Sequence, residues 1–305
     1  MAGMVHPFDE LVFSGAVLDR QAHLRADPDA LETLRRDPAA RVLEAGGMAV
    51  AVERSGDGAR LATRPVEPGD AGRDLALLGR LGPHLLLAAL GGDGGTPLRQ
   101  VADLLTPQEA GHAATAVALD NWHRTHPRCP RCGAQTELAQ AGWVRHCLQD
   151  GSDHHPRTDP AVIMAVVDAE DRLLLAQGAG WPQGRMSVLA GFVEPGETLA
   201  GAVAREVREE VGLEVVDVTY QADQPWPFPG SLMVGFTARA TSAELTPDGT
   251  EIADARWFTR AELAEAFEHG ELRRPAPVSI SARLIEQWFG GPLTRPSDIG
   301  AVRAL

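Results

Sequence analysis

The chain has 305 residues, of which 44% are hydrophobic, and a chain of this length can bury one full core or two. Its 28 basic and 42 acidic side chains give a formal charge of -14. Such a charge repels polyanions at long range and excludes the basic surface expected of a duplex-DNA-binding protein. We therefore expect no DNA partner, and we expect any phosphate ligand to be held by metal ions or by local basic groups.

The chain also carries no pattern that predicts export or membrane insertion. Its first residues lack a basic region followed by an apolar one, and the apolar run 85–90 is too short to span a bilayer. All three cysteines fall between positions 129 and 147, and an odd, clustered set favours metal binding over disulfides. These features predict a cytoplasmic protein with no membrane segment.

Residues 1–105 mix short apolar stretches with glycine, proline and charged residues, a pattern that predicts strands joined by loops. No aromatic residue occurs between Phe13 and Trp122. Flat side chains for stacking on a base are therefore missing from this part, and we expect base recognition in the second half of the chain.

Helix start signals are clear further along the chain. Thr106 and Glu109 form a capping box with proline at position 107, and the helix that follows is expected to run to about His126 and to stop at Pro127. Residues 161–168 and 173–177 predict two buried strands of a hairpin.

Two later helices complete this pattern. Thr259 with Glu262 starts a second capped helix, and residues 281–289 form a final amphipathic one. This alternation suits a mixed sheet covered by helices, which is an α+β fold.

The segment 191–213, GFVEPGETLAGAVAREVREEVGL, matches the pattern G-x5-E-x7-R-E-U-x-E-E-x-G-U at every defined position, where U is a bulky aliphatic residue. A chance match has odds of roughly one in 10^8 at each starting position. On a helix beginning near Thr198, the carboxylates of Glu206, Glu209 and Glu210 share one face within a turn. Their mutual repulsion is relieved when Mg²⁺ or Mn²⁺ accepts carboxylate oxygens.

Other residues of this segment have predictable structural roles. We expect Gly191 and Gly196 to let the loop before the helix turn tightly, and Gly212 to cap the helix in a left-handed conformation. Arg205 is expected to pair with a carboxylate and orient it. The alternative interpretation, an ordinary solvated helix rich in acids, is disfavoured by the complete pattern.

A second motif follows in residues 223–236, DQPWPFPGSLMVGF. It resembles the SQPWPFPxS element of the NADH pyrophosphatases, a family of Nudix hydrolases whose box the segment 191–213 matches, with Asp223 in place of the usual serine. Its three prolines fix an extended loop that holds Trp226 and Phe228 in place. The alternative is a packed turn that binds no ligand.

The resemblance implies a Nudix α/β/α sandwich with a mixed sheet, preceded by a Nudix-like N-terminal domain and a small zinc ribbon, and it implies a homodimer. The expected limits are 1–122 for the N-terminal domain, 123–155 for the ribbon, 156–290 for the Nudix domain and 291–305 for a C-terminal tail.

The resemblance also implies site residues. It assigns metal binding to Glu206, Glu210, Glu251 and the carbonyl of Ala190, and it leaves Glu209 or Glu210 as the catalytic base; Glu251 could instead be a surface acid. His155 stands where the family has a tyrosine that sandwiches a base. The expected substrate contacts are Phe192, Gln224, Pro225, Trp226, Pro227, Phe228, Pro229, Gly230, Ser231, His155 and Ser281.

The cysteines form a third motif. Cys129 and Cys132 make a C-x2-C knuckle, and Cys147 follows at a spacing that suits a zinc ribbon. The family has a fourth cysteine where this chain has Asp150, whose oxygen can complete a tetrahedral zinc site. The alternative fourth ligands are His146, His154 and His155, and a further alternative is a ribbon with free thiols and no zinc.

Together these motifs predict an enzyme that uses two or three Mg²⁺ or Mn²⁺ ions to split NAD(H) into AMP and NMN(H). Three alternatives stay open. The substrate could be another nucleoside diphosphate derivative such as ADP-ribose, or the NAD cap at the 5′ end of RNA. The protein could also be a catalytically inert zinc-ribbon sensor of nucleotides.

Overall fold

The structure is a computed structural model that describes residues 8, 11–14 and 18–293. Residues 294–305 of the expected C-terminal tail therefore lie outside the described residues. The chain divides into two compact units. We call residues 12–158 with 225–231 the N-terminal unit, and we call residues 1–11, 159–224 and 232–305 the C-terminal unit.

The N-terminal unit is built on a sheet with the strand order β6-β7-β1-β2-β8, and β5 also pairs with β1. The pairing of β1 with β7 is parallel, whereas β6–β7 and β1–β2 are antiparallel, so the sheet is mixed. The strands are β1 (Ala40–Gly46), β2 (Ala49–Val50), β5 (Thr63–Pro65), β6 (Leu75–Leu81), β7 (His84–Ala89) and β8 (Thr96–Pro97), and β3 (Val52–Ser55) pairs with β4 (Gly58–Leu61) in a separate hairpin.

Helices cover both faces of this sheet because its strands bury alternate side chains on opposite sides. Leu43 joins the core formed with α2 (Pro107–Thr125), and Val42 joins the core formed with α1 (Ala30–Arg36). The predicted capping box of α2 is confirmed. Short 3-10 turns connect these elements: η1 (Ala22–Ala26), η2 (Pro68–Asp70), η3 (Leu98–Gln100), η4 (Ala102–Leu104) and η5 (Gln140–Gly142).

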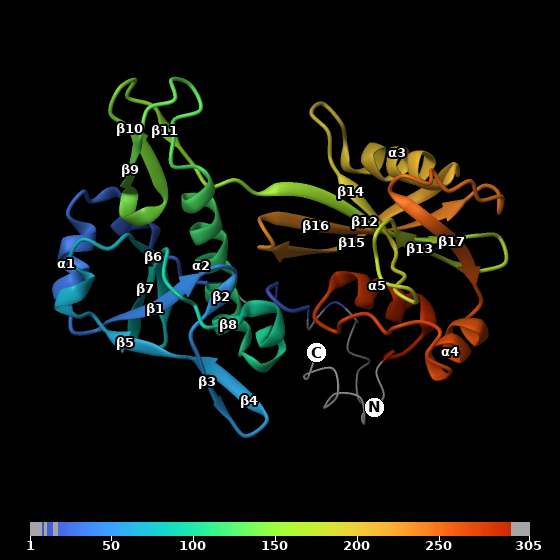
Figure 1. Ribbon diagram of the computed structural model, residues 1–305, viewed down its shortest axis with the longest axis horizontal. Coiled ribbons are helices and arrows are strands. Elements are labelled where there is room, and N and C mark those ends of the chain that lie inside the picture. The colour runs from blue at the N-terminus through green and yellow to red at the C-terminus, as the bar shows by residue number, and fades with distance from the viewer. Residues whose placement is uncertain (1–7, 9–10, 15–17, 294–305) are drawn as a thin grey trace. The chain divides into compact units, whose positions relative to one another are not determined.

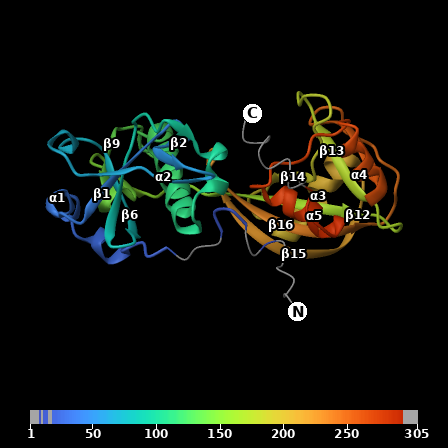
Figure 2. The same cartoon turned by 90° about the horizontal axis from the view of Figure 1, so that it is seen from below.

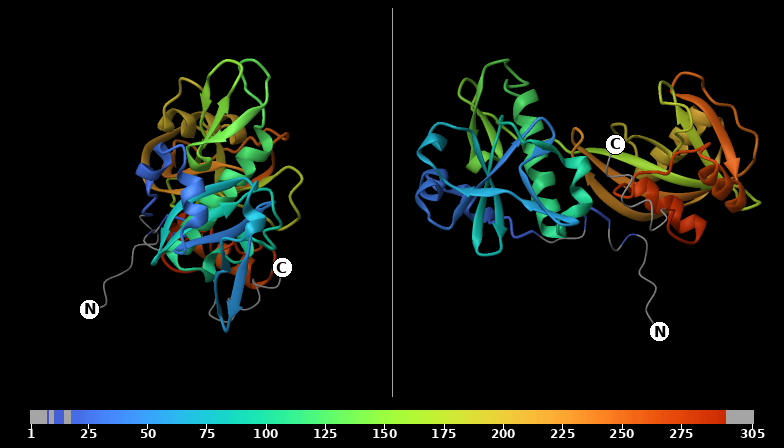
Figure 3. Two further views of the ribbon diagram at one scale, coloured as in Figure 1. Left: turned by 90° about the vertical axis from the view of Figure 1, so that its left-hand side faces the viewer. Right: turned by 60° about the horizontal axis from the view of Figure 1, so that its bottom comes forward.

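A small antiparallel sheet follows α2 in the order β11-β10-β9 (Figure 3). A buried arginine, Arg145, ties it to the helix, since its guanidinium donates to Thr136 Oγ1 at 2.7 Å and to His123 Nδ1 at 2.9 Å. The strands are β9 (Thr136–Ala139), β10 (Val144–Cys147) and β11 (Asp153–His154).

The C-terminal unit contains a second sheet with the order β15-β16-β12-β13-β17, and β14 pairs with β12. The predicted hairpin is confirmed as the antiparallel pair β12–β13, and β15 and β16 run side by side (Figures 1 and 2). The strands are β12 (Asp159–Val167), β13 (Leu173–Gly178), β14 (Leu189–Phe192), β15 (Val215–Trp226), β16 (Ser231–Ala240) and β17 (Ile252–Phe258).

Three helices sandwich this sheet, with α3 on one face and α4 and α5 on the other (Figure 1). Val162 and Met164 pack with α3, whereas Ile163 and Ala165 pack with α4 and α5. The predicted α+β class and helix-covered sheet are therefore confirmed. The helices are α3 (Leu199–Val211), α4 (Arg260–Glu268) and α5 (Ile280–Phe289). Among the described helices, none has the length and apolar character of a membrane span.

Candidate functional site

The acidic helix α3 is fixed at both ends as its sequence predicts. The hydroxyl of Thr198 accepts from the N–H of Gly201, and Gly212 ends the helix with a φ of 74°. Its apolar residues pack on the sheet. Glu206 and Glu210 keep only 8% and 6% exposure because they lie toward the protein rather than toward solvent.

Glu206 reaches β14 through the space left by a glycine. A Cβ at Gly191 would lie 1.9 Å from Cδ of Glu206, so this carboxylate packs directly on the strand that carries Ala190. The expectation that Gly191 serves a tight turn is wrong, because Gly191 lies within β14 and its role is to make room for Glu206. Gly196 does have a positive φ, 89°.

Arg205 orients the carboxylates around it, as expected. It donates to Glu206 Oε1 at 2.9 Å, to Glu209 Oε2 at 3.0 Å and to the carbonyl of Phe192 at 2.8 Å. Two further bonds, of 2.9 and 3.0 Å, join it to the carboxylate of Glu197. These carboxylates raise the pKa of Arg205, Glu197 most of all. The structural role of Glu197 was not predicted, although Glu197 occupies a defined position of the box.

Glu210 lacks a partner for a buried polar atom. Its Oε2 is buried and accepts no hydrogen bond. Burial, and then the negative charges of Glu206, Glu251 and Asp248, raise the pKa of Glu210 to about 8. Burial is also the main reason why the pKa of Glu206 is raised, with Arg205 opposing it. A buried oxygen without a donor among several carboxylates fits a divalent cation, which accepts such oxygens directly.

Asp248 builds the loop that carries Glu251. Its carboxylate accepts from the N–H groups of Glu251, at 3.0 Å, and Ile252, at 2.8 Å, while its own N–H donates to the carbonyl of Glu210 at 3.0 Å. The Thr250 hydroxyl and then these N–H groups lower the pKa of Asp248 to about 2. The loop therefore ends beside α3. Asp248 was not predicted, although the Asp-Gly pair at 248–249 is a local turn signal.

Two predicted contact residues of the C-terminal unit have different environments. The side chain of Phe192 is 60% exposed and can receive a planar ligand. Gln224 is fully buried, and its amide donates to the carbonyl of Val278 at 2.7 Å and accepts from the N–H of Ile280 at 2.9 Å. It thereby holds the segment that leads to Ser281, whose hydroxyl lies 2.8 Å from that of Ser279.

The tryptophan-proline loop, residues 225–231, belongs to the N-terminal unit. Trp226 and Phe228 pack edge to face with ring centroids 5.1 Å apart, and each lies 6.4 Å from the ring of Phe13. Arg99 covers both rings, at 5.1 and 4.3 Å from their centroids. These aromatic side chains thus have protein partners on several sides.

A buried amide fixes the backbone of the same loop. Asn121 donates from Nδ2 to the carbonyls of Pro227 and Pro229 at 3.0 and 3.1 Å. The N-terminal unit also contains the exposed His155. The predicted contacts therefore divide between the two units, because Phe192, Gln224 and Ser281 belong to the C-terminal unit with the acidic helix.

The four predicted zinc ligands come together. Ligand atoms of Cys129, Cys132, Cys147 and Asp150 all lie within 4.8 Å of one another. Two equivalent turns present them. The N–H of Gly133 donates to the carbonyl of Cys129 and the N–H of Gly151 donates to that of Cys147, both at 2.9 Å. Asp150 thus occupies in the second knuckle the position that Cys132 occupies in the first.

Neighbouring donors favour the charged forms of Cys129 and Asp150. At Cys132 the N–H of Ala134 lowers the pKa of the thiol, but burial and the neighbouring thiols outweigh it and raise that pKa to about 11. Burial opposes ionisation of Cys129, but backbone N–H groups and the Ser152 hydroxyl outweigh it and lower the pKa of this thiol to about 6. The hydroxyl and N–H of Ser152 hold the pKa of Asp150 well below its usual range. Ser152 in turn lies 3.0 Å from Nε2 of His154. His146, another of the three alternative ligands, pairs with Asp153 instead.

Comparison with known families matches these two regions. Residues 157–277 match the model of the NUDIX domain, and residues 124–154 match the model described as the NADH pyrophosphatase zinc ribbon domain. The two matches cover the acidic helix and the cysteine cluster respectively.

Curated relatives match over part of the chain. A Mycobacterium bovis (strain BCG / Pasteur 1173P2) protein, "NAD-capped RNA hydrolase NudC", is 44% identical over 200 residues, which are 63% of this chain and 64% of the relative. The human "NAD-capped RNA hydrolase NUDT12" is 40% identical over 197 residues, 61% of this chain and 43% of the relative. The chain thus spans less than two thirds of these relatives' own length.

Proposed function

We propose that this chain, a member of the Nudix superfamily that also carries the zinc ribbon of the NADH pyrophosphatases, hydrolyses the pyrophosphate bond of NAD(H) to give AMP and NMN(H). The NAD cap at the 5′ end of RNA is a substrate of the same chemistry, and the names of the relatives support it. The observation that carries the proposal is the buried, unpartnered oxygen of Glu210 among the acids of α3 and its neighbouring loop.

In this proposal the chain binds two or three Mg²⁺ or Mn²⁺ ions. Glu206, Glu210 and Glu251, with the carbonyl of Ala190, would hold them, because each offers the hard oxygen that these cations prefer. When bound, such ions neutralise the charge of the diphosphate and lower the pKa of a water so that it can attack phosphorus. Without cations, the buried acids would repel one another and the substrate alike.

The chain's own side chains supply orientation and proton transfer. Arg205 fixes the direction of the Glu206 and Glu209 carboxylates through its bonds to both. In this proposal Glu209 or Glu210 takes the proton of the attacking water. The exposed ring of Phe192 stacks on one base of the dinucleotide.

The remaining contact residues hold the rest of the substrate. Gln224 positions the segment before Ser281, whose hydroxyl contacts the ligand. For the loop 225–231 and for His155, which belong to the N-terminal unit, contact with the substrate stays a prediction.

Replacing Glu210 with Gln tests the proposal. This change keeps the size of the side chain but removes its charge. We expect NADH hydrolysis to fall by at least about 100-fold, since mutating even a residue that only hydrogen-bonds to a metal ligand lowers metal affinity or activity by about 10- to 100-fold. Glu214→Gln, an exposed acid just past the helix, is the matched control and should keep its activity. Near-normal activity of Glu210→Gln with an intact fold would refute the assignment.

Product analysis separates the rival functions. The protein is incubated in Mn²⁺ with NADH, ADP-ribose and NAD-capped RNA, and the products are resolved by chromatography. AMP and NMNH from NADH support the proposal. Turnover of ADP-ribose alone would identify a different Nudix hydrolase, and binding without any product would identify an inert nucleotide sensor.

We also propose that Asp150 completes a structural zinc site with the three cysteines. Asp150→Ala should weaken zinc binding by about 10-fold or more, measured by competition with a chromophoric chelator, whereas Asp150→Cys should retain it. His146→Ala and His154→Ala serve as controls. Loss of zinc in either of those variants, with retention in Asp150→Ala, would assign the fourth ligand to a histidine. A homodimer and a cytoplasmic location stay predictions, the former testable by analytical ultracentrifugation.

A further inference from the structure

Two arginines of the N-terminal unit share one aromatic ring. The guanidinium carbon of Arg25 lies 3.6 Å from the ring centroid of Trp143, and that of Arg20 lies 5.6 Å from it. Both guanidinium groups thus make a cation–π contact with the same indole ring. Two positive charges therefore lie side by side, although one arginine would be enough to cover the ring.

Two of the three residues contact strand β6 directly, Arg20 through its backbone and Trp143 through its indole N–H. Gly79 of this strand makes room for the chain at positions 19 and 20, since a Cβ there would lie 2.2 Å from the carbonyl oxygen of Asp19. The indole N–H of Trp143 donates to the carbonyl of Leu77 at 2.7 Å. Arg20 also donates to the hydroxyl of Thr115 on α2, at 3.4 Å. The pair is therefore preorganised on a rigid sheet.

The arginines have many free donors and no counter-charge. Each guanidinium has five N–H donors, but the described residues accept one hydrogen bond from each, Arg25 donating to the carbonyl of Arg20 at 3.2 Å. The Nε of Arg25 is buried without a partner. No carboxylate of the described residues forms an ion pair with either arginine. Of the acids close by in sequence, Asp19 accepts from Gln21 and Asp27 accepts from the N–H of Asp29.

Arg20 is exposed and Arg25 is half-buried, and the two cations repel each other. Burial and then the charge of Arg20 lower the pKa of Arg25 to about 10, and burial also lowers the pKa of Arg20. The chain as a whole carries 42 acidic side chains, yet none of the described ones forms an ion pair with these two arginines. An anion between the two guanidinium groups would relieve the repulsion and satisfy the unused donors.

We propose that Arg20, Arg25 and Trp143 form an anion-binding site that takes a phosphate group of a nucleotide. The fork of a guanidinium matches two phosphate oxygens, and Trp143 holds one fork in a fixed plane. The phosphate could come from a free nucleotide or from an RNA chain downstream of its cap; the RNA source rests on the proposed function. The site itself is independent of the acidic helix.

Thermal unfolding in phosphate and in chloride of equal ionic strength is the first test. Phosphate stabilises proteins in general by exclusion from their surface, so the comparison is between variants. We expect inorganic phosphate to raise the melting temperature of the wild type by about 2–4 °C more than that of Arg20→Gln/Arg25→Gln. Arg36→Gln, an exposed arginine on α1 that pairs with Glu32, is the matched control and should behave as the wild type.

The single variant Arg20→Gln separates a binding role from a structural one. Because it removes the repulsion but keeps Arg25 on Trp143, its melting temperature in chloride should equal or exceed that of the wild type. A fall of several degrees, together with an unchanged response to phosphate, would show that the pair serves packing and would overturn the proposal.

Fluorescence anisotropy identifies the source of the phosphate. A labelled, uncapped single-stranded RNA and a labelled ATP are titrated without added Mg²⁺ or Mn²⁺. If RNA is the source, the double variant loses at least about tenfold in affinity and its salt slope falls by about 0.7 for each lost phosphate contact. Binding of ATP alone supports the free nucleotide, and equal binding by the double variant and Arg36→Gln overturns the site.

The activity of the double variant keeps the two proposals distinguishable. Its hydrolysis of free NADH should match the wild type, because the arginines lie outside the acidic helix and its loop. A protein that hydrolyses NADH normally but fails both binding tests would retain the proposed function and lose the anion site.

Discussion

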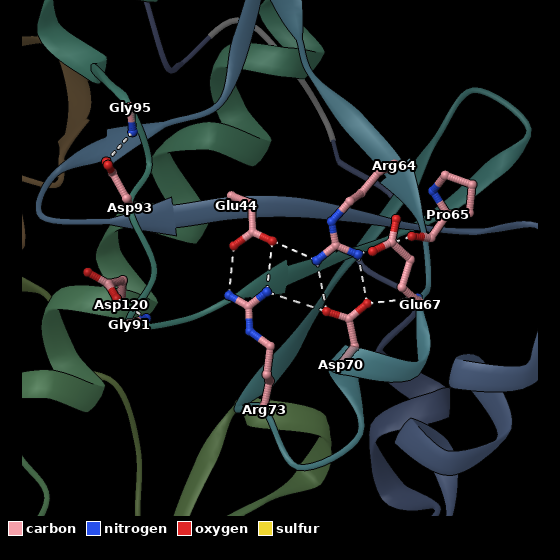
Figure 4. A network of polar contacts seen from close by, with 10 residues as sticks. All are labelled: Glu44, Arg64, Pro65, Glu67, Asp70, Arg73, Gly91, Asp93, Gly95 and Asp120. Atoms are coloured by element: carbon pink, nitrogen blue, oxygen red, sulfur yellow. Dashed lines mark hydrogen bonds and ion pairs between the residues drawn. The ribbon is translucent and has the colours of Figure 1, made fainter.

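Two groups of carboxylates in this molecule have opposite surroundings. In the N-terminal unit, Glu44 accepts from Arg64 at 2.6 Å and from Arg73 at 2.7 and 2.8 Å, and Asp70 accepts from Arg64 at 2.7 and 2.8 Å (Figure 4). Two negative and two positive charges thus balance within one network. In the C-terminal unit, Glu206 has one arginine and Glu210 has none.

The pKa values follow these surroundings. Hydrogen bonds from Arg64 lower the pKa of Asp70 to about 2, whereas burial among other acids raises the pKa of Glu210 to about 8. Both groups contain acidic side chains of low exposure, so burial alone does not tell whether a carboxylate stabilises the fold or binds a cation. A balanced group stabilises the fold. An unbalanced one is unfavourable in the protein alone and therefore indicates a cation that binds there.

The largest effect on stability is expected from Asp70→Asn. This side chain is 2% exposed between its arginines, and removing one partner of a buried pair costs about 3 kcal/mol in the free energy of unfolding. NADH hydrolysis by the folded protein should not change. The free energy is measured by urea unfolding.

Arg60→Gln is the matched control for this prediction. It breaks the ion pair with Glu53, whose side chains are 71% and 55% exposed, and exposed pairs contribute about 1 kcal/mol or less. A loss in Asp70→Asn no larger than in this control would remove the distinction between the two groups of carboxylates.

Gly191→Ala should separate activity from stability in the acidic helix. The added Cβ would meet the end of the flexible Glu206 side chain rather than backbone, so the fold can adapt but the carboxylate must move. A displacement of about 1 Å can cost about 100-fold in rate. We therefore expect a fall of about that size in the kcat for NADH with little change in melting temperature.

Gly69→Ala provides the control, because a Cβ at Gly69 meets nothing within 4 Å. Full activity in both variants would show that the position of Glu206 against β14 does not matter for turnover.

The features predicted correctly from sequence are those set by neighbouring residues. The caps at Thr106, Thr198 and Thr259 lie where the residue order places them, because a capping hydroxyl bonds to an N–H only three positions further on. The clustering of the three cysteines also came from local spacing, whereas Asp150 as the fourth ligand came from the family resemblance.

Features that depend on distant contacts could not be predicted. The rings of Trp226 and Phe228 pack on Phe13 and Arg99, which are far away in the chain. The proline-rich motif alone therefore could not predict these contacts. The role of Gly191 was misjudged for the same reason, since only the folded structure shows that Glu206 fills the space beside it.

A pH series tests the balanced group with the smallest expected effect. The pKa of Asp70 is lowered from 3.8 to about 2 in the folded protein, so as pH falls the unfolded chain takes up this proton first. Stability from Asp70 is therefore fully present above about pH 5 and is lost as pH falls from about 4 toward 2. The loss amounts to about 2 kcal/mol.

The difference between the wild type and Asp70→Asn isolates this contribution from that of the other carboxylates. Urea unfolding of both proteins between pH 7 and pH 3 should give a difference that is constant near neutrality and shrinks below about pH 4. A constant difference down to pH 3 would mean that the arginines do not stabilise the ionised carboxylate. In that case the network around Asp70 would owe its stability to packing rather than to charge. Only the acidic helix would then support the distinction between paired and unpaired acids.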